Sequence, residues 1–374
     1  MKAFSKEKQI VSGLLALAEV EINGNQPWDV QVHDESCYKR VLAEGILGLG
    51  ETYMEGMWDC QALDQFFYKV ACARLEEKVK INLKLVAYYL KNKLLNLQTK
   101  KKAFTLKHYE IGNDLYMKML DKRLTYTCGY WDKVDNLDAA EEAKLDLVCR
   151  KVGLRPGMKV LDIGCGWGSF MKYACEKYGV SCVGITISQA QMDLGQKICR
   201  GLPIEFRFQD YRDLKGQYDA VVSIGMFEAV GYKNYSTYMK IVSRCLKEDG
   251  LFLLHTIGSN HSNSLKTVDP WTRKYIFTQG ALPSIKQIGQ SIEELFVMED
   301  WHNFGADYDK TLMAWNANFQ KHWPELKNSY SETFHRMWQY YLLLCAGSFR
   351  ARSIQLWQIV LSKQGVAGGF KTIR

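Results

Sequence analysis

Most of this 374-residue chain is predicted to form an α/β fold with a parallel sheet, and three observations support that prediction. Hydrophobic residues make up 47% of the chain and charged residues 24%, which is enough apolar material for one or two packed cores. From about residue 145 onward, short β-rich runs alternate with helical stretches. A glycine-rich loop follows the first of those runs. The alternation predicts helices on both faces of the sheet.

Five predicted strands and three predicted helices make up this domain. The strands span 159–163, 181–187, 204–208, 219–224 and 251–257, and the helices lie near 169–178, 188–200 and 234–247. Residues 1–77 have a mainly helical pattern and a balanced charge, with turn signals at 23–27 and 45–50. We therefore expect a small helical accessory domain at 1–77, a connecting segment at 78–107 and the α/β domain at 108–374.

The net charge of +8 is concentrated in that connecting segment. Nine lysines and no acidic residue lie between Lys78 and Tyr109, so the segment carries +9 and the rest of the chain about −1. Leucines interleave with the lysines, which predicts a basic amphipathic helix that attaches to an anionic membrane surface. The alternative is a solvent-exposed helix that only links the two domains and binds no membrane. Nucleic acid is a further alternative, but no aromatic base-stacking platform accompanies the lysines, so no nucleic-acid partner is expected.

The cysteine pattern and the hydropathy of the chain indicate the cellular compartment in which the protein is expected. Eleven cysteines are scattered from Cys37 to Cys345 without a C-x-x-C pair or zinc-type spacing, which indicates a reducing cytoplasm and no structural metal. No apolar run approaches the roughly 18 to 20 residues that a membrane-spanning helix needs. The start of the chain imitates a secretory signal, but its small-x-small triplet lies inside the apolar run, so an amphipathic helix is expected there. We expect a cytoplasmic protein, peripheral on the inner membrane face.

The loop at 160–168 reads VLDIGCGWG and ends a predicted strand. Gly164, Gly166 and Gly168 allow backbone amides to approach a ligand at a helix N-terminus. A dinucleotide fingerprint would read G-x-G-x-x-G, whereas here the third glycine comes one residue earlier and Asp162 precedes the first. This combination favours S-adenosylmethionine over NAD, and with it a Rossmann-like, class I S-adenosylmethionine-dependent methyltransferase domain.

Two further cofactor positions follow from the strand order, because ligands bind at the carboxyl ends of the strands in such sheets. The second strand passes Thr186 without the acid that usually holds the ribose hydroxyls, and Gln191 is the nearest suitable side chain. Asp210 at the end of the third strand is placed to face the adenine amino group. Each of these residues alone is more often a surface or capping residue.

Several motifs extend over nearly the whole chain. They read YTCGYW at 126–131, VLDIGCGWG at 160–168, GITIS at 184–188, QDYRD at 209–213, GMFE at 225–228, LLHTIG at 253–258, DWHNFGADY at 300–308 and CAGSFRAR at 345–352. In these motifs the chain resembles bacterial cyclopropane-fatty-acyl-phospholipid synthases, which are relatives of the mycolic acid cyclopropane synthases. The glycine loop is shared by many methyltransferases, whereas the other motifs are specific to this family.

The resemblance implies a set of site residues. A ring around a bound bicarbonate ion, the proton acceptor, would consist of Cys128, Glu228, His255, Ile257 and Tyr308. Tyr126, the glycine loop and Thr186 to Gln191 match the family's cofactor contacts, and we also expect Asp162, Asp210 and Tyr211 to contact the cofactor. Cys345 matches a cysteine often discussed as functional, and the family suggests a homodimer. Ala229 stands where the family usually has histidine, so no role of that histidine is carried over.

The implied chemistry needs residues of these types. An alkene is a poor nucleophile, so its attack on a sulfonium methyl requires orientation in a dry site, and the resulting cation must lose a proton before a ring closes. Glu228 and His255 are candidates to hold the small oxyanion, and Trp301, Phe304 and Tyr308 are candidates to stabilise the cation. Taken alone, His255 and the aromatic run are more often core residues, and Cys128 and Cys345 are inert thiols by default.

We therefore predict an enzyme that transfers a methylene group from S-adenosylmethionine to a cis double bond of a phospholipid acyl chain at the bilayer surface. One alternative is a fatty-acyl methyltransferase that gives a methyl-branched or methylene product. An alternative of another class is a non-catalytic lipid- or RNA-binding protein.

Overall fold

The computed structural model describes residues 5–75, 111–262, 268–277 and 280–374. The basic segment 78–107, on which the membrane prediction rests, lies outside these residues. The chain divides into two compact units. Unit 1 comprises Met1–Ile111, Asp269–Thr278 and Trp315–Ser353, and unit 2 comprises Gly112–Val268, Gln279–Ala314 and Ile354–Arg374.

Unit 1 is mainly helical, as the pattern of residues 1–77 predicts. Its helices are α1 (Lys6–Ala16), α2 (Cys37–Glu44), α3 (Ile46–Met54), α4 (Leu63–Cys72), α13 (Pro270–Tyr275) and α16 (Glu332–Arg350), with a two-stranded sheet of β1 (Gln31–Val32) and β2 (Trp58–Asp59). The structure groups the chain differently from the expected division at residue 108, because α13 and α16 belong to this unit. The indole of Trp271 lies 4.4 Å from the ring of Tyr340, so α13 and α16 share the aromatic core of the unit.

Unit 2 contains a seven-stranded sheet with the order β5-β4-β3-β6-β7-β9-β8. Its strands are β3 (Lys159–Ile163), β4 (Ser181–Thr186), β5 (Ile204–Phe208), β6 (Tyr218–Ile224), β7 (Leu246–Ser259), β8 (Val297–Asn303) and β9 (Ile354–Ser362). Strands β3 to β7 are parallel, which confirms the predicted α/β fold. The sheet is not wholly parallel, however. β9 runs antiparallel to both β7 and β8, and neither β8 nor β9 was among the predicted strands.

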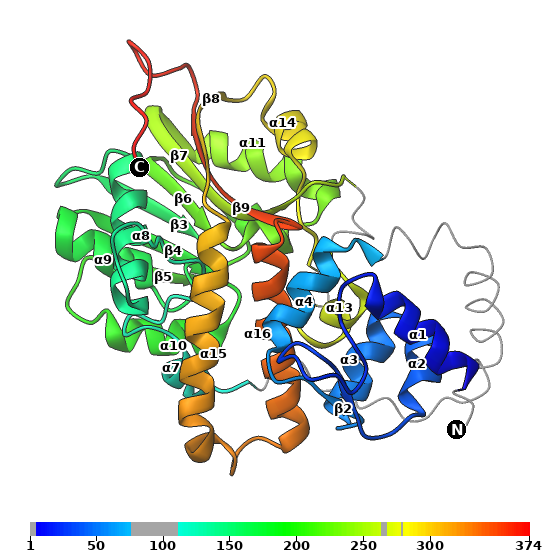
Figure 1. Ribbon diagram of the computed structural model, residues 1–374. Helices are drawn as coiled ribbons and strands as arrows, with labels where there is room; N and C mark the ends of the chain where they lie inside the picture. Colours follow the sequence, from blue (N-terminus) through cyan, green and yellow to red (C-terminus); the bar gives the residue numbers. More distant parts are fainter. Residues whose placement is uncertain (1–4, 76–110, 263–267, 278–279) are drawn as a thin grey trace. The chain divides into compact units, whose positions relative to one another are not determined.

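Helices cover both faces of this sheet (Figure 1). They are α8 (Leu137–Lys151), α9 (Ser169–Tyr178), α10 (Gln189–Ile198), α11 (Tyr235–Cys245) and α14 (Ile285–Ile292). The unit also contains α7 (Asn113–Met119), and α15 (Ala306–Leu326) includes residues of both units. Apolar residues of α8 and α9 pack with Val160 and Val222 on one face. Apolar residues of α11 and α14 pack with Leu161 and Val221 on the other. The alternation along β3 and β6 separates the two cores, as the two-residue period of a strand requires.

The parallel strands bring their carboxyl ends to one edge of the sheet. The glycine loop follows β3, Thr186 ends β4, and the 3₁₀ turns η1 (Tyr211–Asp213) and η2 (Phe227–Ala229) follow β5 and β6. The sequence-predicted residues of unit 2 therefore converge by topology alone. Within the described residues, no helix combines the length and apolarity needed to cross a membrane.

Candidate functional site

The glycine loop is shaped by three left-handed residues. Gly164, Gly166 and Gly168 have φ values of +87°, +54° and +86°, a region that favours glycine. A Cβ at Gly164 would lie 2.6 Å from the Met226 side chain, and one at Gly168 would lie 2.6 Å from Phe206. A Cβ at Gly166 would meet no atom within 4 Å. The loop is therefore closed on two sides and open at Gly166, as a cradle for a ligand at the start of α9 must be.

Helix α7 lies against this loop and was not identified from the sequence. The Asn113 Oδ1 atom accepts a hydrogen bond of 3.0 Å from the Trp167 indole N–H. The Tyr116 ring lies 5.0 Å from Trp167 and 5.1 Å from Tyr126. Tyr126, a predicted cofactor contact, is thus fixed beside the loop by aromatic packing. No motif spacing marks Asn113 or Tyr116, because their role depends on where α7 packs.

The predicted ribose contacts Thr186 and Gln191 lie together. The Thr186 hydroxyl donates to Gln191 Oε1 over 3.3 Å and accepts from the Ser188 N–H over 3.1 Å. Asp210 is instead engaged by Arg212, whose Nε and Nη2 atoms donate to its two oxygens over 2.8 and 2.7 Å. The Tyr211 ring packs edge-on against Tyr238 at 5.2 Å. An adenine contact from Asp210 would have to compete with the exposed Arg212.

Asp162 is almost completely buried on β3. Its Oδ1 atom has no hydrogen-bond partner among the described residues. Burial raises the pKa of Asp162 to about 7, and the charge of Lys144 limits that rise. A buried acceptor without a partner is costly, which supports a ligand or solvent contact at this position.

Glu228 lies on η2 and reaches across to β7. Its Oε1 atom accepts a hydrogen bond of 2.6 Å from the Ile257 backbone N–H, whereas its Oε2 atom is buried without a partner among the described residues. Burial raises the pKa of Glu228, although the Ile257 N–H and the Thr256 hydroxyl act in the opposite direction. The predicted residues Glu228 and Ile257 are therefore in direct contact.

His255 is held by β9 and not by Glu228. It pairs in register with Gln358, whose Nε2 atom lies 3.3 Å from His255 Nδ1. Burial and the charges of Lys144 and Lys151 keep the pKa of His255 well below its ordinary value, so the ring is neutral. When the Gln358 amide donates to Nδ1, the proton of the neutral ring resides on Nε2. That Nε2 atom is buried and has no partner among the described residues.

Cys128 and Tyr308 are the remaining residues of the predicted ring. Cys128 is fully buried, its Sγ atom lies 3.1 Å from the Gly129 carbonyl oxygen, and burial raises the pKa of its thiol, which is therefore neutral. Burial also raises the pKa of Tyr308, and the ionisable groups of Cys128, Tyr126 and Glu228 add to that rise. Tyr308 thus lies within electrostatic reach of residues from both the predicted cofactor side and the predicted anion side.

Trp301 does not join this group. Trp301 packs edge-on against Trp357 at 5.0 Å, in the core that β3 builds with α11 and α14. Because neighbouring residues of a strand face opposite ways, Trp301 points away from the face where Phe304 lies 5.9 Å from the His255 ring. The expected cation contact of Trp301 is therefore wrong. Cys345 belongs to α16 in unit 1, where burial raises the pKa of its thiol.

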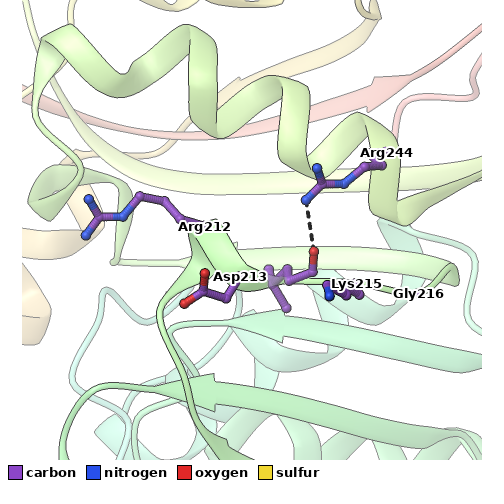
Figure 2. A pocket seen from close by; sticks show the side chains of 6 residues that line it. Arg212, Asp213, Lys215, Gly216 and Arg244 are labelled. Atoms are coloured by element: carbon purple, nitrogen blue, oxygen red, sulfur yellow. Dashed lines mark hydrogen bonds between the residues drawn. The ribbon is translucent and has the colours of Figure 1, made fainter.

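A separate surface pocket lies beside the start of β6. It is lined by Arg212, Asp213, Leu214, Lys215, Gly216 and Arg244 (Figure 2). Arg244 donates to the Leu214 carbonyl over 2.9 Å, and Arg212 is paired with Asp210. None of the predicted catalytic residues lines this pocket. Among the described residues, no group of three or more His, Cys, Asp or Glu side chains is arranged to hold a metal ion.

A mixed, mainly parallel seven-stranded sheet with a glycine loop after β3 defines the class I S-adenosylmethionine-dependent methyltransferases. Residues 97–359 match the family model described as mycolic acid cyclopropane synthetase. The chain therefore belongs to the mycolic acid cyclopropane synthetase family, which confirms the resemblance.

Individual relatives agree with this assignment. The chain is 52% identical over 368 residues to the cyclopropane-fatty-acyl-phospholipid synthase of Escherichia coli (strain K12), covering 98% of this chain and 96% of that protein. It is 34% identical over 267 residues to a probable fatty acid methyltransferase of Pseudomonas putida, covering 68% of each. A crystal structure of a mycolic acid cyclopropane synthase complexed with SAH and CTAB matches with a TM-score of 0.64 at 31% identity, covering 69% of this chain and 97% of that one.

Proposed function

We propose that this protein transfers a methylene group from S-adenosylmethionine to a cis double bond of an unsaturated phospholipid acyl chain, forming a cyclopropane ring, with bicarbonate as the proton acceptor. The observation that carries the proposal is the pair of buried, unpartnered atoms Glu228 Oε2 and His255 Nε2. The Glu228 oxygen is an acceptor, and His255 Nε2 is a donor when Gln358 donates to Nδ1; both belong to loops or strands at the cofactor edge of the sheet.

The residues around the glycine loop fit S-adenosylmethionine. The open side of Gly166 leaves room for the ligand, and the Thr186–Gln191 pair supplies the donors and acceptors for ribose hydroxyls. When bound, S-adenosylmethionine supplies an electrophilic methyl group on a sulfonium. Tyr126, which packs against Tyr116 beside the loop, would form the wall between the cofactor and the reacting chain.

Bicarbonate fits the two unpartnered atoms because it carries both a hydroxyl and oxyanion oxygens. Glu228 Oε2 would accept from the hydroxyl, and His255 Nε2–H would donate to an oxygen. The neutral state of His255 matters because a neutral ring has only one N–H donor. When Gln358 donates to Nδ1, that donor is Nε2–H. An ion held in this way would supply the base that the carbocation needs.

The remaining walls favour a cationic transition state in a dry site. Phe304 is buried against the His255 ring, and Tyr308 is buried on α15 near Glu228. Aromatic faces stabilise a nearby cation by about 0.5 to 2 kcal/mol each. The raised pKa of Tyr308 keeps its ring neutral, so it stabilises the cation without becoming a competing nucleophile.

A phospholipid substrate requires attachment to a bilayer surface. The name of the Escherichia coli relative specifies a fatty-acyl-phospholipid, and the CTAB in the solved relative is a long-chain cationic surfactant. The nine lysines of 78–107 would bind anionic headgroups. We extend the proposal to peripheral binding on the inner membrane face, in the cytoplasm, as a homodimer. Catalysis by 108–374 and a functional role for Cys345 also remain proposals.

The second candidate is a fatty-acyl methyltransferase, which the identity to the Pseudomonas putida protein favours. Expression in a host without cyclopropane lipids separates the two activities. Mass spectrometry of the lipids should show acyl chains heavier by one methylene, and proton NMR should show cyclopropyl signals that survive hydrogenation of alkenes. A product that hydrogenation consumes would favour the methyltransferase. No new lipid, together with no binding of S-adenosylhomocysteine by the purified chain, would favour a non-catalytic protein.

A further inference from the structure

Helix α8 turns charged residues into the interior of unit 2. Glu141, Lys144 and Lys151 are all fully buried, and their spacing places them on one face of the helix. Lys151 lies 3.4 Å from Asp300 and 3.1 Å from His302 Nδ1. Lys144 has a different set of partners and lies next to the candidate site.

The Lys144 ammonium makes two close contacts. It donates a hydrogen bond of 2.7 Å to the Thr127 hydroxyl, and it lies 3.2 Å from Glu141 Oε2. Thr127 stands between Tyr126 and Cys128, which are the predicted cofactor-side and anion-side residues of one segment. The hydrogen bond therefore fixes the backbone between the two walls of the site.

The other end of the Thr127 side chain packs against the loop that carries Glu228. A Cβ at Gly225 would lie 2.5 Å from Thr127 Cγ2, so only glycine leaves space for this methyl group. Gly225 has a φ of +70°, and its N–H donates to the His255 carbonyl oxygen over 2.9 Å. Lys144, Thr127, Gly225 and the His255 backbone thus form one continuous series of contacts.

Stability alone does not account for a lysine at this position. Removing an ammonium and a carboxylate from water costs several kcal/mol per ion, and well-packed apolar residues of similar volume are often as stable or more so. Apolar residues at both 141 and 144 would fill the same space without that penalty. The favourable consequence of the buried ammonium is the directed hydrogen bond to Thr127.

We propose that Lys144 is a positioning residue: through its hydrogen bond to Thr127 it holds the segment of Tyr126 and Cys128 against Gly225, and so sets the distance between the cofactor and the proton acceptor. The inference rests on the proposed function for its effect on turnover. Its effect on cofactor affinity is independent of which lipid product forms.

The charge of Lys144 acts in the same region. It lowers the pKa of Asp162, Glu141 and Cys128 against the effect of burial, and it contributes to the low pKa of His255. These groups come from α8, β3, β7 and the segment after α7. Lys144 is therefore electrostatically central to the site as well as bonded to its wall.

The test is a double-mutant cycle between Lys144→Met and Thr127→Val in the full chain. Both replacements keep the volume, and Thr127→Val keeps a methyl group against Gly225. Each single variant should bind S-adenosylhomocysteine about tenfold more weakly by calorimetry, because each removes a charge-assisted hydrogen bond. Each should also lower kcat on unsaturated phospholipid vesicles. The double variant should be no worse than the weaker single variant, because both changes remove one interaction.

Two matched backgrounds separate positioning from a general loss of packing. In Thr127→Ser, which keeps the hydroxyl, Lys144→Met should have its full effect. Thr125→Val alters the same segment, but the Thr125 hydroxyl bonds Ser169 over 2.6 Å, so in that background Lys144→Met should again have its full effect.

Equal effects of Lys144→Met with and without the Thr127 hydroxyl would overturn the proposal. If Lys144→Met does not fold, a folded Thr127→Val chain with unchanged affinity and kcat would overturn it equally. Absence of cyclopropane product from the wild-type chain would refute the proposed function while leaving the affinity cycle valid.

Discussion

Glu228→Gln should lower turnover strongly without lowering stability. The Glu228 Oε1 atom accepts from the Ile257 N–H over 2.6 Å, and a glutamine oxygen can keep that bond in neutral form. At the position of the unpartnered Oε2 atom, however, glutamine places a donor where the proposed ion offers a hydroxyl. The change affects the proton acceptor and leaves the local backbone in place.

The magnitude follows from the lost interaction. Losing a hydrogen bond to a charged group costs about 1.5 to 3 kcal/mol, and every 1.36 kcal/mol is tenfold in rate. We therefore expect turnover to fall by roughly 10²-fold, within the range for general acid–base catalysis. With the acceptor misplaced, part of the carbocation should end as a methyl-branched alkene instead of a ring.

The stability of the folded chain should rise in Glu228→Gln, although its turnover falls. Burial raises the pKa of Glu228 above its ordinary value of 4.5, so the folded chain binds this proton more tightly than the unfolded chain. Wild-type stability is therefore lost, relative to the glutamine variant, as the pH rises from about 4.5 through the folded pKa. At neutral pH the variant should unfold at an equal or higher temperature than the wild type.

The assay measures initial rates on vesicles of unsaturated phospholipid, with and without bicarbonate, and analyses products before and after hydrogenation. Thermal unfolding at several pH values gives the stability. Glu248→Gln is the matched control, because Glu248 is exposed and pairs with Lys363, and it should change neither rate nor product. A wild-type rate and product in Glu228→Gln, together with full activity in bicarbonate-depleted buffer, would place the base elsewhere.

Three further predictions concern the cofactor, the buried charges and the membrane. Gly166→Val should abolish S-adenosylhomocysteine binding in a folded chain, whereas Gly157→Val, which has a similarly strained φ of +86° in open space, should bind normally; equal binding in both would refute the loop assignment. Burial raises the pKa of Glu141 to about 8, so Glu141→Gln should gain stability relative to wild type as the pH rises from about 4.5 to about 8, and thermal unfolding with a constant difference would contradict this. Binding to anionic vesicles should fall steeply with salt, because the Debye length shrinks from ~10 Å at 0.1 M to ~3 Å at 1 M, and replacing Lys100, Lys101 and Lys102 with Gln should weaken it further. Vesicle binding that changes neither with salt nor with these lysine replacements would indicate that 78–107 is only a linker.

The strands of the sheet were predictable where the local residue pattern alone marks a strand and its ends. The runs 159–163 and 204–208 coincide with β3 and β5, because branched residues bounded by turns leave little choice of register. β9 was missed because it lies almost a hundred residues after β7 and pairs with it only through tertiary packing. Contacts between residues so far apart in the chain leave no local pattern in the sequence. The antiparallel edge and the packing of Trp301 against Trp357 on β9 were therefore not predicted.

The motifs predict the candidate site residues, but they do not predict the residues that contact and position them. They predict Glu228 and His255 as site residues, but they do not indicate that Gln358 on β9 contacts the His255 ring. Glu141 and Lys144, three residues apart on a helix, have the pattern of a solvent-exposed ion pair. Only the packing of α8 against the sheet shows that both are buried.

The buried polar atoms of the site have a common physical meaning. Glu228 Oε2, His255 Nε2 and Asp162 Oδ1 each lack a partner among the described residues, and each such atom costs about 1 to 3 kcal/mol in a protein whose net stability is about 5 to 15 kcal/mol. Other buried atoms without a partner among the described residues, such as Tyr38 Oη and Tyr340 Oη, lie in unit 1, so the meaning of these three rests on their shared place in the sheet. These three atoms lie on β3, β7 and η2, which topology brings to one edge, and His255 Nε2 is the donor among them when Gln358 donates to Nδ1. A pair of ligands that together offer hydroxyls and oxyanion oxygens satisfies all three, which is what a ribose-bearing cofactor and bicarbonate would do.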